Sequence, residues 1–158
     1  MINFIERYGP LSIGLLAALL LLAFNEKIVG LAAAGLIDIS SLYSAMFDWA
    51  SIQTGFLFGV FGFVSGKSSG FMAEVAKTKA MIDFNRYTRT AILLGFTVTL
   101  VSIPLIVTAF HFKAGEPWRY ATFVGWAFLT AWSFFSFARV AYVFGVMLKV
   151  GDRTRVPG

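Results

Sequence analysis

The sequence predicts an all-α fold: an integral membrane helical bundle of four transmembrane helices, with an amphipathic basic helix between spans two and three. Hydrophobic residues make up 58% of the 158 residues and charged residues only 13%, whereas soluble domains are close to half apolar and one quarter charged. The apolar residues also gather in runs of about 20, the length that crosses a bilayer. We therefore expect residues 1–158 to form a single transmembrane domain.

The first span is predicted at residues 8–24, with Pro10 near its start, where proline suits the first helical turn. A cleavable signal peptide is the alternative. The leading residues carry Glu6 beside Arg7 and are not basic, so we expect a retained anchor. Residues 25–37 are about half a span. They extend the first helix or form a re-entrant piece, and their alanines favour one long helix.

The second span is predicted at residues 49–65, within a helix that starts after a break at residues 38–41. Asp38 and Ser41 suit that break, because Asp and Ser side chains accept hydrogen bonds from the free N–H groups of a first helical turn. The polar residues that begin at Lys67 end the apolar run.

Residues 71–90 alternate apolar and charged side chains, which predicts an amphipathic helix outside the hydrocarbon. Lys79 and Asp83 are spaced to pair on it. Three roles are open: contact with anionic lipid headgroups, binding of a nucleotide or short nucleic acid, and docking onto a protein partner. The candidate residues for ligand or headgroup contact are Lys67, Lys77, Lys79, Arg86 and Arg89.

The third span is predicted at residues 91–110, a run without charge in which Pro104 should produce a kink. A polar loop follows, in which Trp118 and Tyr120 should anchor the chain at the membrane interface.

The fourth span is predicted at residues 121–141. Arg139 lies near its end, where a long side chain can reach the headgroups. Ser133, Ser136 and Arg139 follow one another at steps of three and could line a polar seam, although serines in helices more often bond to their own backbone.

Basic residues indicate the orientation. With four spans, ten of the 13 Lys and Arg residues fall on the side that holds both termini and the connection between spans two and three. Basic loops stay in the cytoplasm. We therefore expect a multi-pass protein of the cell inner membrane with both termini in the cytoplasm.

Small and polar residues form a stripe along the second helix. They recur at steps of three and four residues, close to the helical period, and so share one face. The stripe consists of Ser44, Asp48, Ser51, Gly55, Gly59, Gly62 and Gly66. Two interpretations fit it. Its GxxxG spacings favour close helix packing, or several copies place the stripe around a pore, with Asp48 and Ser44 at its outer mouth as a cation-selective ring.

The sequence gives little support for catalysis or metal binding. The chain has no cysteine and one histidine, His111, and no catalytic constellation is evident. We expect no enzyme activity, no cofactor and no metal site. The function predicted is a homo-oligomeric membrane pore or ion channel. The alternatives are a non-conducting subunit or scaffold of a larger membrane complex, and a holin-like lysis protein.

The short chain, the glycine-lined helix and the basic segment from Lys67 to Arg89 together resemble the compact membrane effectors of bacterial anti-phage defence, of the Hailong type. The resemblance rests on size and layout. It implies a tetrameric channel held closed by a short nucleic acid, whose opening depolarises the infected cell. It also implies that Lys77, Lys79, Arg86 and Arg89 contact that ligand.

Overall fold

The computed structural model describes residues 2–66, 79–111 and 116–153, apart from some side chains at helix ends. These residues form helices and no strand: α1 (Ile2–Ala23), α2 (Asn25–Ala33), α3 (Ile39–Gly66), α5 (Lys79–Val107) and α6 (Pro117–Arg153). Three helices, α3, α5 and α6, are long and apolar enough to cross a membrane, and α1 with α2 adds a fourth if the two count as one bent span.

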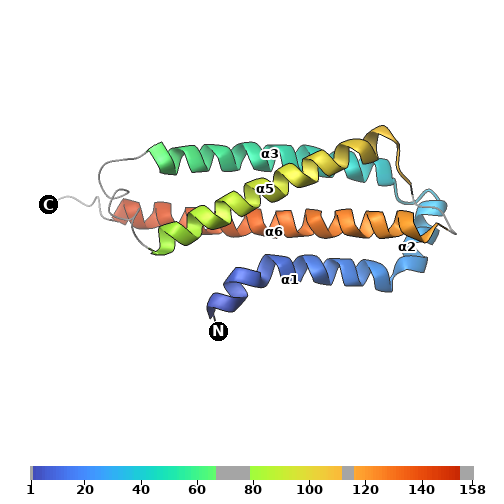
Figure 1. Ribbon diagram of the computed structural model, residues 1–158, viewed down its shortest axis with the longest axis horizontal. Helices are drawn as coiled ribbons and strands as arrows, with labels where there is room; N and C mark the ends of the chain where they lie inside the picture. The colour runs from blue at the N-terminus through green and yellow to red at the C-terminus, as the bar shows by residue number, and fades with distance from the viewer. Residues whose placement is uncertain (1, 67–78, 112–115, 154–158) are drawn as a thin grey trace.

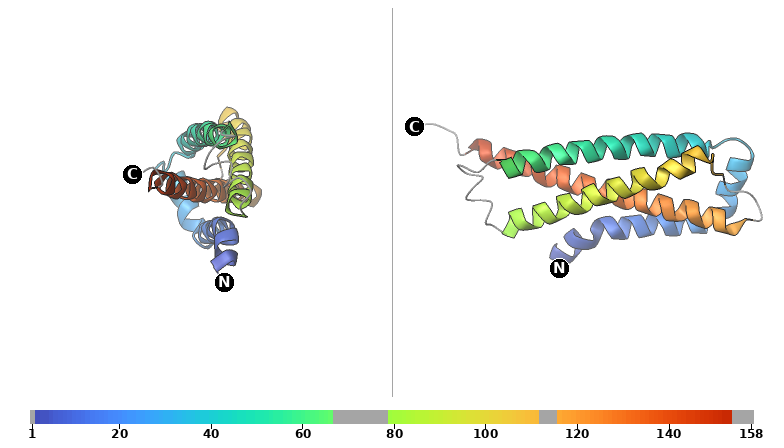
Figure 2. Two further views of the ribbon diagram at one scale, coloured as in Figure 1. Left: turned by 90° about the vertical axis from the view of Figure 1, so that its left-hand side faces the viewer. Right: turned by 45° about the horizontal axis from the view of Figure 1, so that its top comes forward.

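The four long helices lie side by side, and each runs opposite to the next along the chain (Figure 1). The end of α3, the start of α5 and the end of α6 lie at one end of the bundle, and α2 lies at the other. Helix α5 packs along both α3 and α6, while α1 packs on α6. The end-on view in Figure 2 places α1 and α3 at opposite sides of the bundle.

The expectation of one long first helix is wrong. Helices α1 and α2 are bent by 69° at a break, because Phe24 leaves the helical backbone conformation, with a ψ of 19°. Pro10 also lies well inside α1, which begins at Ile2, and not in its first turn. Helix α2 consequently crosses the end of the bundle (Figure 1).

Helix α3 begins where the sequence predicts. The Oδ1 atom of Asp38 accepts hydrogen bonds from the backbone N–H groups of Ser40 and Ser41, at 3.0 and 3.2 Å, and the Ser41 hydroxyl donates to Oδ2 at 2.6 Å. These bonds satisfy N–H groups that have no partner within the helix. The predicted cap is therefore confirmed.

Residues 79–90 of the basic segment do not form a helix of their own. Its described part, residues 79–90, is the start of α5, which continues without a break to Val107. Met81 and Phe84 are buried in an apolar cluster with residues of α3 and α6. Residues 79–90 therefore lie along the bundle, because their apolar side packs there. The other residues of the predicted segment, 71–78, lie outside the described residues.

Helix α6 begins at Pro117 and not near residue 121, so Trp118 and Tyr120 belong to its first turn. Trp118 is exposed, as an interface anchor would be, but Tyr120 is buried and donates a hydrogen bond to the Leu21 carbonyl at 2.5 Å. Tyr120 thus fastens α6 to α1.

Two apolar clusters fill the interior. One, near α2, is centred on Tyr43 of α3 and Trp126 of α6, whose rings meet edge to face at 4.7 Å. The other surrounds Leu57 and Phe84 at the opposite end. A layer of buried polar side chains, including Gln53 and Ser133, separates them.

Candidate functional site

The stripe on α3 faces away from the other described helices. All seven of its residues are exposed, whereas Tyr43, Ala50 and Leu57, on the other side of α3, are fully buried. A Cβ atom added at Gly55 or Gly59 would meet nothing within 4 Å, and the same holds for the other two glycines of the stripe. The glycines therefore make no close packing contact with the described residues. This face is left open to a partner.

Asp48 is the one charged residue of α3. The neighbouring hydroxyls of Ser44 and Ser51 donate to backbone carbonyls four residues earlier, at 3.2 and 2.9 Å. No hydrogen bond or ion pair of Asp48 is found within the described residues. Its carboxyl group thus lies on a surface of small residues, beside two serine hydroxyls that are already hydrogen-bonded to the backbone.

The charges of the other helices define a charge-free band around the bundle. On α6 no charged residue lies between Arg119 and Arg139, a distance of about 30 Å at 1.5 Å per residue. On α5 none lies between Arg89 and the helix end at Val107. This height equals the hydrocarbon thickness of a typical bilayer.

Contacts between helices place Asp48 near the middle of this band. Tyr43 packs on Trp126, so Asp48 lies about 18 Å further along the bundle than Arg119. Gly95 faces the α3 segment at residues 50–54, so Asp48 is also about 15 Å from the level of Arg89. The pore-mouth position predicted for Asp48 differs from its level in this band, which is set by the contacts of α3 with α5 and α6.

A polar node on the opposite side of α3 joins three helices. The Gln53 side chain donates to the Ser133 hydroxyl of α6 at 2.9 Å. Gly95 of α5 lies so close that an added Cβ would stand 2.3 Å from the Thr54 hydroxyl. The absence of a side chain at Gly95 therefore allows α5 to approach α3.

The polar seam expected on α6 exists in part. Ser133 accepts the bond from Gln53, and Ser136 is equally buried. A second bond between helices runs from the Trp126 indole to the Ser102 hydroxyl at 2.9 Å. Sequence reasoning missed Gln53 and Ser102; a lone amide inside an apolar run was the available signal, because it needs a partner in hydrocarbon.

The candidate basic residues fall into two groups. Lys67 and Lys77 lie outside the described residues, while Lys79, Arg86 and Arg89 are exposed.

Within the described residues, Asp83 pairs with Arg86 at 2.9 Å and not with Lys79 as the spacing suggested. Arg139 reaches across from α6, and its guanidinium lies 3.8 Å from the ring centre of Tyr87 on α5.

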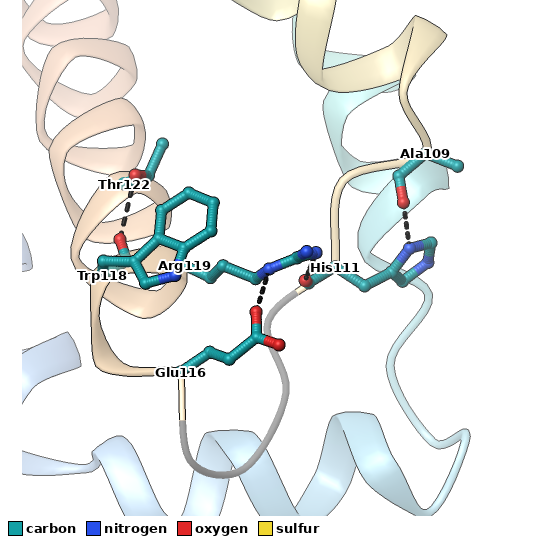
Figure 3. A network of polar contacts seen from close by, with 6 residues as sticks. All are labelled: Ala109, His111, Glu116, Trp118, Arg119 and Thr122. Atoms are coloured by element: carbon teal, nitrogen blue, oxygen red, sulfur yellow. Dashed lines mark hydrogen bonds and ion pairs between the residues drawn. The ribbon is translucent and has the colours of Figure 1, made fainter.

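Arginine and aromatic side chains also meet at the other edge of the band. Arg119 pairs with Glu116 and donates to the His111 carbonyl at 3.1 Å (Figure 3). Its guanidinium lies 5.1 Å from the Trp118 ring centre. Such aromatic residues are typical of membrane interfaces.

No protein family, curated protein or solved structure matches this chain.

The site is therefore interpreted from its geometry alone. In the described part of the chain, no group of three or more His, Cys, Asp or Glu side chains is arranged to hold a metal ion. What the geometry offers is an exposed face of small residues with one carboxyl group at mid-height.

Proposed function

We propose that several copies of this chain form a cation-conducting pore in a membrane, with the stripe of α3 facing the shared axis. In this arrangement the chain crosses the bilayer four times, because α1 and α2 together make one bent crossing. Both termini and ten of the 13 basic residues lie on the cytoplasmic side of the cell inner membrane. The copies are needed because apolar clusters fill the interior of each chain.

The level of Asp48 carries the proposal. In a bilayer fitted to the charge-free band, Asp48 stands on the outer surface of the chain, about 18 Å from one edge and about 15 Å from the other. A charged Asp at the centre of a membrane helix costs about 2.5–3.5 kcal/mol by insertion measurements. Such residues usually face other helices or water. A water-filled lumen removes this cost, and a ring of carboxylates within it attracts cations.

The small residues of the stripe supply the space for such a lumen. Beyond Asp48 the stripe continues with Ser51, Gly55 and Gly59, and each added Cβ at the glycines would meet open space. Larger side chains, such as Phe56 and Phe58, lie on α3 beside the stripe and are exposed. They can pack against a neighbouring copy while the stripe borders water.

The scaffold alternative uses the same face differently. There the glycines pack against a helix of another protein, and Asp48 meets a polar group of that partner. This predicts no current from the purified chain. A holin-like protein instead predicts large, non-selective holes, which lack a cation preference in the original chain and in Asp48→Asn alike.

Planar-bilayer recording with purified protein tests the proposal. We expect discrete unitary currents with a preference for cations, and a smaller preference in Asp48→Asn. Asp83→Asn is the matched control, because it removes the same charge from a residue outside the band that pairs with Arg86. It should leave selectivity unchanged.

The possible results separate the alternatives. Loss of cation preference in Asp48→Asn alone supports an Asp48-lined pore. Equal selectivity in all three proteins excludes that role of Asp48 and favours a holin-like hole. Absence of current from an oligomer freed of bound ligands favours the scaffold.

The resemblance to defence effectors adds a regulatory expectation. A short oligonucleotide added on the basic side should then close the pore, and replacing Lys77, Lys79, Arg86 and Arg89 with Gln should abolish that closure. Current that is indifferent to the oligonucleotide would remove this part of the proposal.

A further inference from the structure

Two arginines from different helices gather around one tyrosine at the basic edge of the charge-free band. The guanidinium carbon of Arg139, on α6, lies 3.8 Å from the centre of the Tyr87 ring, and that of Arg86, on α5, lies 5.7 Å from it. Arg86 also pairs with Asp83 at 2.9 Å, with just over half of its side chain exposed. Solvent therefore reaches the Arg86–Asp83 ion pair, so Arg86 can bind a second anion as well.

The level of these groups matches that of lipid phosphates. Arg139 and Arg89 mark the edge of the band, and Arg86 lies about 4.5 Å beyond Arg89 along α5. The headgroup region is about 5–7 Å deep on each side of the hydrocarbon. Lys79, ten residues before Arg89 on the same helix, lies about 15 Å beyond that edge. It is therefore past the phosphates, although it is also exposed and basic.

The chemistry favours phosphate over a carboxylate or a neutral headgroup. A guanidinium presents a planar fork of donors that matches two oxygens of one phosphate. Contact with the Tyr87 ring restricts the orientation of the Arg139 guanidinium. Two such groups from two helices can hold one phosphate and thereby join α5 to α6.

We propose that Arg86 and Arg139, arranged around Tyr87, bind the phosphate of an anionic lipid at the basic edge of the bundle. The inference rests on the chain crossing a membrane. It does not depend on conduction, so it survives if the pore proposal fails.

Lipid-dependent thermal unfolding in detergent tests the site. We expect phosphatidylglycerol to raise the unfolding temperature of the full chain more than phosphatidylcholine does. Arg139→Gln and Arg86→Gln should each raise the half-saturating concentration of phosphatidylglycerol roughly tenfold, as for the loss of one hydrogen bond to a charged group. Lys79→Gln is the matched control and should bind like the original chain.

The result is decided by comparison among the variants. If Lys79→Gln weakens binding as much as Arg86→Gln, the attraction is general surface charge and the site is refuted. Equal stabilisation by both lipids also refutes it. Free glycerol phosphate is the second probe; if it stabilises the chain as well as the lipid does, the phosphate comes from a soluble ligand and the lipid assignment is wrong. Arg86→Gln keeps the test valid if Arg139→Gln does not fold.

Discussion

Gly95 is the position at which α5 approaches α3 most closely in the polar node. A Cβ atom there would stand 2.3 Å from the Thr54 hydroxyl and 3.2 Å from the Gln53 amide nitrogen. Thr54 is buried, and its hydroxyl donates to the Ala50 carbonyl at 2.7 Å. The threonine cannot move aside without losing that bond. Gly95→Ala should therefore force the two helices apart.

Gly95→Ala has two opposing effects on stability: a cost from overpacking and a gain from replacing glycine within a helix. Overpacking of an interior costs about 1–3 kcal/mol, while replacing glycine by alanine within a helix gains about 0.5–1 kcal/mol. From the midpoints of these ranges, we expect Gly95→Ala to lower the free energy of unfolding by about 1 kcal/mol. Gly59→Ala is the matched control on α3. Because its Cβ would meet nothing within 4 Å, it should show only the gain.

The assay is equilibrium unfolding, followed by circular dichroism, in a detergent that keeps the chain monomeric. The two glycine variants should shift stability in opposite directions. In a Thr54→Ala background, which lacks the hydroxyl in the way, the cost of Gly95→Ala should fall. Shifts of the same sign in both glycine variants, or a cost that Thr54→Ala leaves unchanged, would refute the close approach at Gly95.

Three further predictions follow from helix ends and from the stripe. Gly35 has a φ of +72° and Ala109 a φ of +44°, so Gly35→Ala should lower the free energy of unfolding by about 1–2 kcal/mol. Ala109→Gly should raise it by a smaller amount, since glycine also raises the entropy of the unfolded chain. Thermal unfolding should show shifts of opposite sign for the two variants. The hydrogen bond from the Ser41 hydroxyl, then that from its backbone N–H, lowers the pKa of Asp38 below its ordinary value of 3.8. The cap should thus stabilise the fold above pH 4 and lose its effect as the pH falls through the lowered pKa; unfolding temperatures that decline equally in Asp38→Asn would contradict this. Gly59→Leu should abolish assembly or current while leaving the monomer folded, and normal oligomers with normal current would remove the stripe from both functional interpretations.

Much of the helical layout could be predicted because the signals are local. Asp38 caps α3 as expected, and the apolar runs correspond to α1, α3, α5 and α6. Boundaries were less accurate where neighbouring helices supply the packing. The basic residues of 79–90 suggested a separate surface helix, but Phe84 packs into the bundle and α5 continues through them.

The candidate site, too, could be predicted only as far as local signals determine it. The spacing of its residues along α3 predicted that they share one face, and this face is exposed in the structure. Neither the level of Asp48 nor the bonding of Gln53 to Ser133 could be predicted in the same way. Both depend on how far α3 is displaced along α5 and α6, and residues 80 positions apart in the chain settle that displacement.

Apolar composition, helical period and capping residues act within a few residues of one another, so they determine from the chain alone that it forms long apolar helices and that one of them carries a stripe of small residues. The bend at Phe24, the outward direction of the stripe and the position of Asp48 at mid-height are tertiary. The last two arise from side-chain packing between helices, in which Tyr43 fits against Trp126 and Gly95 against Thr54. Such contacts have no local signature, because each half of the fit lies on a different helix.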